Sequence, residues 1–239
     1  MLSEVSLLSA TSYLSELVEY WALCLSSSDV EYLLGRGASE AQIEGMRLGT
    51  ALKLPHPSGD SEEVRRFMRW AGGGKRLMGQ ISFPLHNQMS EVTGVLVKSA
   101  GAKDYMKYTR SGTAVSSFFF GVPMAMEALW RTRTVWIVEG VFDWFPLQRL
   151  FPNTLACTFD TLGWKQIDFV RRYVDTVVLA LDMDASGRDG AELAQERLRG
   201  VEVLTARYPY KDPGDFWQKR GEFAFQQHFL EESQRLGLT

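Results

Sequence analysis

The sequence predicts an α/β protein with an α+β unit over residues 1–132 and a parallel-sheet α/β unit over residues 133–215. In the first unit, short strand-like segments are separated by polar turns, which is typical of an antiparallel sheet. In the second unit, continuously apolar strands alternate with helical segments, which is typical of a parallel sheet covered on both faces. Residues 216–239 are expected to form a helical tail.

Helices are expected at the start of the first unit. Residues 1–33 carry apolar side chains at mixed three- and four-residue spacing, and Ser39 is placed to N-cap a short helix. Residues 53–61 are expected to form a loop. Residues 62–70 form a charged helical segment that ends at the glycine run 72–74.

A hairpin and then the alternating second unit follow. Residues 77–85 and 93–99 are expected to pair across a polar turn. The second unit has strand segments at 134–140, 153–159, 175–184 and 201–209, and helical segments at 141–151, 162–174 and 185–200. Pro146 is tolerable only in or near the first turn of its helix, because proline cannot donate a backbone hydrogen bond.

Charge is distributed unevenly along the chain. Residues 1–64 hold 3 basic and 10 acidic side chains, residues 65–133 hold 11 and 3, and residues 134–239 hold 12 and 16. These balances of -7, +8 and -4 add up to the net charge of -3. Such asymmetry suggests an anionic partner at the middle of the chain and a cation or polar ligand at an end.

Several classes of protein are disfavoured by composition. The chain shows no apolar run long enough to span a bilayer and no signal-peptide pattern at its start, so no membrane association is expected. Cys24 and Cys157 belong to no CxxC pair, which excludes a zinc ribbon within this chain. We therefore expect a cytoplasmic protein.

Carboxylates follow the apolar strands of the second unit. Glu139 ends one strand, with Asp143 four residues on, and Asp182 and Asp184 end another. In open α/β sheets, ligands bind outside the carboxyl ends of the strands. Alternate side chains of a strand point the same way, so Asp182 and Asp184 are expected to reach one ion together. For Asp143 alone, helix capping is an equally good explanation.

A divalent cation would resolve the repulsion within such a group of acids. Clustered carboxylates do not all ionise unaided. Mg²⁺ takes oxygen ligands and keeps positions open for phosphate oxygens, and paired ions of this kind serve nucleotidyl transfer. The pattern therefore predicts a Mg²⁺ site of the kind used in phosphoryl or nucleotidyl transfer.

These residues resemble a known family. Glu139-Gly140, Asp143 and the segment 180–192 (ALDMDASGRDGAE) resemble the two signatures of TOPRIM domains. Upstream segments resemble, in the same order, the core of DnaG-type primases. They are YLLGRGASEAQIEGMRLG, RLMGQISFPLHNQMSEVTGVLVKS and KYTRSGTAVSSFFFG, and YKDPGDF follows downstream. The resemblance covers residues 30–217 and implies a primase core that synthesises primers on single-stranded DNA from nucleoside triphosphates.

The resemblance implies a role for each matching residue. Glu139 would be a metal ligand or proton-transfer partner, and Asp182, Asp184 and Asp212 would ligate Mg²⁺ or Mn²⁺. Asp143 and Asp215 would support that cluster. The residues expected to contact nucleotide or template are Arg76, Lys98, Lys107, Tyr108 and Arg110, with the Tyr108 ring stacking on a base.

The basic residues of the middle segment are expected to line a track for single-stranded DNA and triphosphate. They are Arg65, Arg66, Arg69, Lys75, Arg76, Lys98, Lys103, Lys107 and Arg110. Any one of them alone is more simply explained as a solvated surface cation. The expectation therefore rests on the net positive charge of the whole segment.

The chain also departs from the family pattern. Arg110, displaced by one residue, stands where the family has asparagine, and Lys98 stands where it has arginine. These departures suggest a divergent branch, encoded by a phage or plasmid. The zinc ribbon of the family is missing, so either the sequence is a fragment, or a separate chain supplies that function, or initiation does not need it. The partners expected on this basis are a separate zinc-ribbon protein or a replicative helicase.

Two alternatives remain open from the sequence. A TOPRIM nuclease would use the same metal chemistry to hydrolyse phosphodiesters. A non-catalytic TOPRIM module would bridge replication or recombination partners, although such a module would be expected to have lost acids that are present here.

Overall fold

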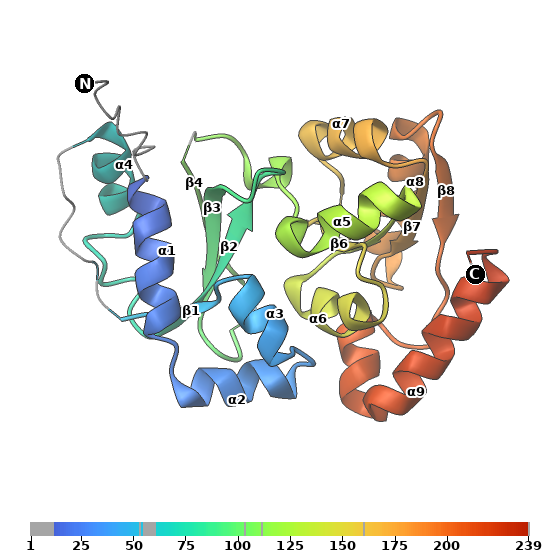
Figure 1. Ribbon diagram of the computed structural model, residues 1–239, viewed down its shortest axis with the longest axis horizontal. Coiled ribbons are helices and arrows are strands. Elements are labelled where there is room, and N and C mark those ends of the chain that lie inside the picture. Colours follow the sequence, from blue (N-terminus) through green and yellow to red (C-terminus); the bar gives the residue numbers. More distant parts are fainter. Residues whose placement is uncertain are drawn as a thin grey trace, which may run out of the picture.

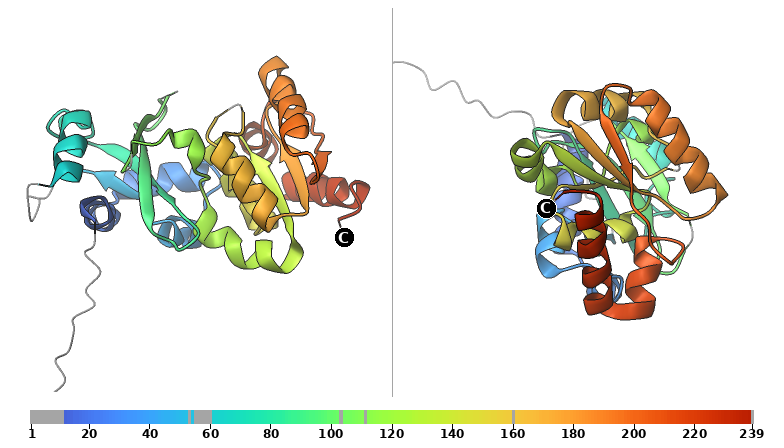
Figure 2. Two further views of the ribbon diagram at one scale, coloured as in Figure 1. Left: turned by 90° about the horizontal axis from the view of Figure 1, so that it is seen from above. Right: turned by 90° about the vertical axis from the view of Figure 1, so that its right-hand side faces the viewer.

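The computed structural model describes residues 12–52, 54, 61–102, 104–110, 112–159 and 161–238. Two units lie side by side along the long axis of the molecule (Figures 1 and 2). No helix among the described residues is both long and apolar enough to cross a membrane. The predicted fold class, an α+β unit followed by a parallel-sheet α/β unit, is confirmed.

The first unit has a four-stranded antiparallel sheet in the order β1-β2-β3-β4. Its strands are β1 (Gly49–Ala51), β2 (Gln80–His86), β3 (Val92–Lys98) and β4 (Met106–Thr109). Its helices are α1 (Tyr13–Leu23), α2 (Ser27–Gly35), α3 (Glu40–Gly45) and α4 (Glu62–Trp70). The expected hairpin is β2–β3, in which Phe83 lies opposite Leu96.

Capping residues set the starts of these helices. Ser39 and Gln42 form the capping box that begins α3, as the sequence predicts. Ser61 caps α4, which ends at Ala71 before a run of glycines with positive φ. The predicted loop at 53–61 lies almost wholly outside the described residues.

The second unit has a four-stranded parallel sheet in the order β6-β5-β7-β8. Its strands are β5 (Thr134–Val138), β6 (Thr154–Ala156), β7 (Thr176–Ala180) and β8 (Glu202–Thr205). Its helices are α6 (Val141–Leu150), α7 (Trp164–Tyr173), α8 (Ala185–Arg197) and α9 (Pro213–Arg235). The short helix η1 (Val115–Ser117) and α5 (Val122–Thr132) lead into it.

Both faces of the parallel sheet are buried, which explains its continuously apolar strands. Trp136 and Val138 of β5 point to the side of α6 and α9, whereas Val135 and Ile137 point to the side of α5 and α7. Figure 1 shows α5 and α7 above this sheet and α6 and α9 below it. Leu129 of α5 packs in the same core as β5, so this helix lies with the second sheet although the sequence placed it before residue 133.

Two details differ from the sequence expectation. Pro146 lies in the second turn of α6, not near its first, because α6 begins at Val141. The expected tail is part of α9, which begins at Pro213 and bends at Gly221, where φ is 73°. Phe225 and Phe229 of α9 are fully buried, so the helix packs on the body of the molecule.

Candidate active site

The acidic residues gather at the carboxyl edge of the parallel sheet. Glu139 follows β5 directly, Asp143 lies in the first turn of α6, Asp182 follows β7, and Asp212 caps α9. Burial raises the pKa of Tyr208, and the charges of these four acids raise it further. All four carboxylates therefore lie within electrostatic range of one phenol, whose hydroxyl donates to the carbonyl of Leu181.

Asp143 is the most deeply placed of the acids. It is 8% exposed, its Oδ2 accepts the N–H of Gly140 at 3.0 Å, and its Oδ1 accepts that of Gly214 at 2.9 Å. Burial raises its pKa well above the usual range, as does the neighbouring carboxylate of Asp212, although the bond from Gly214 works against this. Asp143 therefore joins the start of α6 to the start of α9.

Asp182 is paired with a lysine across the site. Its Oδ2 lies 2.6 Å from Nζ of Lys211, which also lies 3.7 Å from Oδ2 of Asp212. Burial raises the pKa of Asp182 and outweighs the opposing hydrogen bond from Lys211. The same hydrogen bond raises the pKa of Lys211. The lysine thus neutralises part of the acidic cluster.

Asp184 and Asp215 have different local partners. Asp184 is exposed and its Oδ1 accepts the N–H of Gly187 at 3.0 Å, which caps α8. Asp215 pairs with Lys219 at 2.9 Å. Capping engages Oδ1 of Asp184, and the expectation that Asp182 and Asp184 reach one ion together stays a prediction.

The donor set fits a magnesium site with few protein ligands. Across the described residues, no three acidic, histidine or cysteine side chains converge as a ready group of ligands. Mg²⁺ commonly uses one or two carboxylates together with water and substrate phosphates. Asp182 and Asp212 offer such a pair. Besides burial, the charge of Asp212 raises the pKa of Asp182, and a divalent ion would relieve this repulsion.

Two cations of the first unit lie beside these acids. Lys98, at the end of β3, is 6% exposed, and its Nζ lies 4.5 Å from the Tyr105 ring centre and 5.0 Å from that of Phe142. Burial lowers the pKa of Lys98, and the charge of Arg36 lowers it further. The guanidinium of Arg36 lies 4.6 Å from the Phe142 ring centre. Burial raises the pKa of Tyr105, the charge of Asp143 raises it further and that of Arg36 lowers it, so the phenol beside Lys98 lies within electrostatic range of both Arg36 and the acidic cluster.

Arg36 was not singled out from the sequence. It is the C-cap of α2, its Nη1 donates to Gln218, and its Nε is buried with no hydrogen-bond partner among the described residues. The signal that could have found it is its place between Gly35 and Gly37 in the segment that resembles the primase core.

The other predicted nucleotide contacts are more scattered. Nζ of Lys107 donates to the carbonyl of Thr158 at 3.2 Å, and the N–H of Thr158 donates to the carbonyl of Glu139, so Lys107 borders the site. Arg110 pairs with Glu63 at 3.3 Å. Arg76 is exposed in the turn before β2.

Tyr108 belongs to the core of the first unit. Its ring is 5% exposed and lies 5.1 Å from the ring centre of Phe67 and 5.2 Å from that of Trp70. A ring enclosed in this way is not placed to stack on a base, which corrects the expectation from its motif. Strand β4 turns this position inward, towards α4.

Part of the expected basic track is solvent-exposed. Arg65, Arg69 and Lys75 are exposed, whereas Arg66 donates to the carbonyl of Arg110 at 2.7 Å. Lys103 lies outside the described residues.

Comparisons with known proteins agree with this geometry. A family model described as Toprim-like matches residues 136–217, which contain the acidic cluster. The catalytic core of the Escherichia coli primase has the same fold, with a TM-score of 0.76 and 20% identity over 92% of this chain and 79% of that one. The chain has the fold of a DnaG-type primase catalytic core with a TOPRIM domain. This confirms the resemblance seen in the sequence.

Two further relatives bear on the DnaG-type fold. The DNA primase of Halalkalibacterium halodurans is 25% identical over 228 residues, which are 84% of this chain and 37% of that protein. The chain thus spans little more than a third of this relative's length. A structure described as the DnaG primase catalytic domain bound to single-stranded DNA matches with a TM-score of 0.73 and 20% identity, over 92% of this chain and 79% of that one. TOPRIM domains and primases generally use divalent metal ions.

Proposed function

We propose that the chain is a primase core that synthesises short RNA primers on single-stranded DNA by metal-dependent nucleotidyl transfer. One observation carries the proposal: an acidic cluster at the strand ends of the second unit lies near two cations of the first, the buried Lys98 and the half-buried Arg36. The acids Asp143, Asp182 and Asp212 suit a cation, and Lys98 and Arg36 suit a triphosphate. Transfer of a nucleotide requires both kinds of group in one site.

Each side chain has a role in this proposal. Glu139 accepts the proton of the attacking 3′-hydroxyl, while Lys98, Lys107 and Arg36 hold the phosphates of the incoming nucleotide. Asp182, Asp184, Asp212 and Asp215, together with Glu139, hold Mg²⁺ or Mn²⁺. When bound, the metal lowers the pKa of the hydroxyl and neutralises charge on the leaving pyrophosphate.

The template is proposed to lie on the first unit. Arg65, Arg69, Lys75 and Arg76 offer exposed positive charge there, and single-stranded DNA is the ligand named for one structural relative. A separate zinc-ribbon protein or a replicative helicase is the partner that we propose for this core.

A primer-synthesis assay tests the proposal. Single-stranded DNA, labelled ribonucleotides and Mg²⁺ or Mn²⁺ are incubated with the chain and with Asp182→Ala/Asp184→Ala, whose fold is checked by circular dichroism. The proposal predicts short oligoribonucleotides from the wild type and none from the folded variant. Cleavage of the DNA without synthesis would identify a TOPRIM nuclease. Retained synthesis in the double variant would overturn the assigned roles of these acids.

A further inference from the structure

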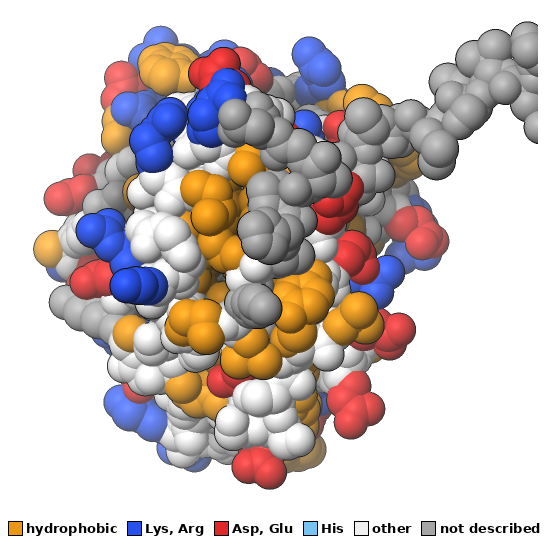
Figure 3. All heavy atoms as spheres, turned by 90° about the vertical axis from the view of Figure 1, so that its left-hand side faces the viewer, with side chains coloured by type: hydrophobic (Ala, Val, Ile, Leu, Met, Phe, Trp, Pro, Cys, Tyr) orange, Lys and Arg blue, Asp and Glu red, His pale blue; other side chains and the backbone are white. Residues whose placement is uncertain are grey.

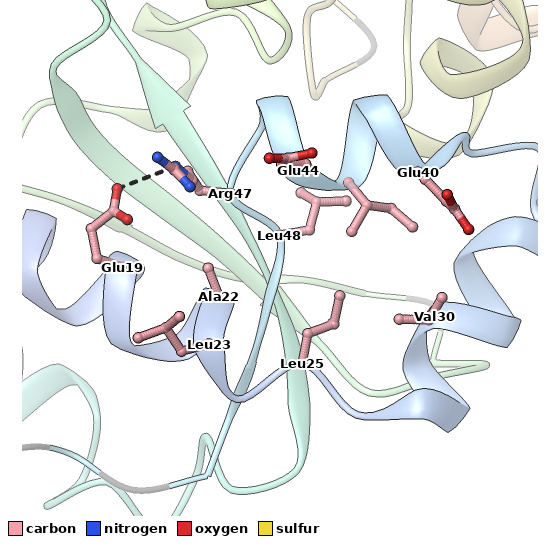
Figure 4. Close-up of a pocket in the computed structure, with 10 residues that line it drawn as sticks. Glu19, Ala22, Leu23, Leu25, Val30, Glu40, Glu44, Arg47 and Leu48 are labelled. Atoms are coloured by element: carbon pink, nitrogen blue, oxygen red, sulfur yellow. Dashed lines mark ion pairs between the residues drawn. The ribbon is translucent and has the colours of Figure 1, made fainter.

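A second surface, separate from the acidic cluster, lies between α1, α2 and α3. It encloses a cavity of about 410 Å³ lined by the end of α1, the start of α2 and the outer face of α3. Figure 4 shows Leu25, Val30 and Leu48 around this space and Leu23 at its edge. We call it the α1–α3 groove. It shares none of its lining residues with the acidic cluster.

The floor of the groove is apolar and open to solvent. Leu48 and Ile43 form part of the buried core, whereas Leu25 and Val30 are half-buried. Leu23, at the end of α1, is 88% exposed, the highest value among the exposed large hydrophobic residues of the described chain. Figure 3 shows hydrophobic side chains gathered in the middle of the end of the molecule that carries α1 and α4. An apolar groove of this kind is the surface into which an amphipathic helix lays its apolar face.

The rim of the groove is acidic. Glu40 and Glu44 lie one turn apart on the exposed side of α3, and neither forms an ion pair within the described part of the chain. Like charges four residues apart on a helix destabilise it slightly. Glu19 is matched by Arg47 at 3.4 Å, so the cation of the rim is already paired. The groove therefore presents two uncompensated negative charges beside apolar side chains.

The surrounding sequence extends this charge. Residues 12–52 hold six acidic and two basic side chains, and one of the two, Arg36, lies beside the acidic cluster of the active site. An anionic surface such as nucleic acid or an acidic membrane would be repelled here. A ligand that fits must combine an apolar stripe with flanking positive charge.

We propose that the α1–α3 groove binds a basic amphipathic helix of a partner protein. Leucine-like side chains of that helix cover Leu23, Leu25 and Leu48, and flanking lysines or arginines pair with Glu40 and Glu44. Helices of this kind recognise grooves through apolar anchors spaced at three and four residues. The inference does not depend on the proposed primase activity, since it concerns a different surface.

Binding of a model peptide tests the proposal. The probe is a labelled amphipathic Leu/Lys peptide of about five helical turns, followed by fluorescence anisotropy with the full chain. The proposal predicts saturable binding that weakens about tenfold or more in Glu40→Lys/Glu44→Lys and in Leu23→Asp. A peptide of the same composition in scrambled, non-amphipathic order is expected to bind far more weakly.

A matched control separates docking from general attraction. Glu192 and Glu196 are also exposed, lie four residues apart on α8 and give the same change of charge when both become lysine. This variant is expected to bind the peptide like the wild type. An equal loss of peptide affinity in Glu40→Lys/Glu44→Lys and Glu192→Lys/Glu196→Lys would overturn the proposal, as would the absence of saturable binding to the wild type. Self-association that disappears in Leu23→Asp would instead assign the groove to a second copy of the chain.

Discussion

Lys98 is the buried cation that the proposed function places beside the triphosphate. Its ammonium lies 4.5 Å from the ring centre of Tyr105 and 5.0 Å from that of Phe142, where burial lowers its pKa. A triphosphate bound beside Phe142 would bring negative charge close to this ammonium, and charge-assisted contacts of this kind are stronger than neutral ones.

Replacing Lys98 by methionine tests this account. The change removes a charge-assisted contact, so nucleotide binding is expected to weaken about 10- to 100-fold. The fold is expected to be kept, because methionine is an apolar side chain of similar length that fills the same space. Nucleotide titration and thermal melts of Lys98→Met measure both, with Lys165→Met on exposed α7 as the control. Unchanged nucleotide affinity would contradict the assignment.

His86 provides a pH test at a distance from the predicted metal ligands. Burial lowers its pKa from 6.5 to about 4, and its Nδ1 is buried with no hydrogen-bond partner among the described residues. The unfolded chain therefore binds a proton more readily than the folded one. The contribution of neutral His86 to the free energy of unfolding is expected to be fully present above pH 6.5. It is expected to fall by up to about 3 kcal/mol as the pH drops towards 4.

The contribution of His86 can be isolated by comparison. Chemical denaturation of the wild type and His86→Leu between pH 7 and 4 gives the difference in their free energies of unfolding. That difference is expected to shift in favour of the variant as the pH falls. A difference that is independent of pH would show that His86 titrates normally.

At the scale of elements, the turn from β7 into α8 depends on one glycine. A Cβ on Gly187 would lie 2.0 Å from the carbonyl oxygen of Asp182, closer than any side chain fits. The N–H of Gly187 also donates to Asp184. The turn therefore fixes the backbone of Asp182 and the cap of α8 together.

Alanine at Gly187 is expected to disturb both features. The backbone must move, so we expect a loss of about 1–3 kcal/mol in stability together with a loss of primer synthesis. At Gly35, near the end of α2, an added Cβ meets nothing within 4 Å, so Gly35→Ala is the matched control and is expected to be neutral or slightly stabilising. Thermal melts of both variants measure this. Equal stability of the two would contradict the account of the turn.

Element positions were largely predictable from the sequence, but the use of single side chains was not. The strand expected at 134–140 is β5, and the expected hairpin is β2–β3. The spacing of apolar residues and the turn residues determine both. Alternation along the strand predicted that Asp182 and Asp184 share an ion, but it did not reveal that Asp184 also caps α8. Tyr108 was assigned from its motif, whereas packing against Phe67 decided its position.

At the scale of the whole molecule, the two units share one core. Phe83 of β2 contacts Phe142 of α6, and Phe120 in the connection contacts Phe83 and Trp144. Such contacts hold Lys98 of one unit beside Asp143 of the other. The sequence predicted the units and their order. It did not reveal this shared core or the packing of α5, because periodicity shows that a face is buried but not what it packs against.

Metal binding is expected to stabilise the whole fold by relieving the clustered acids. At a concentration ten times its dissociation constant, Mg²⁺ would raise the free energy of unfolding by about 1.4 kcal/mol. This corresponds to a rise in Tm of about 3 to 6 °C. Asp182→Asn/Asp212→Asn is expected to lose this rise and to keep the cap of α9, because asparagine caps as well as aspartate. Thermal melts with Mg²⁺ or with a chelator measure it. An equal rise in wild type and variant would place the metal elsewhere.

The most direct test of the account is the rate of primer synthesis in a matched pair of glutamate variants. Glu139→Gln removes the proposed proton acceptor at the end of β5, whereas Glu127→Gln makes the same chemical change on the exposed side of α5. The account predicts that Glu127→Gln synthesises primers like the wild type and that Glu139→Gln synthesises about 100-fold less or none. Undiminished synthesis by folded Glu139→Gln would contradict it.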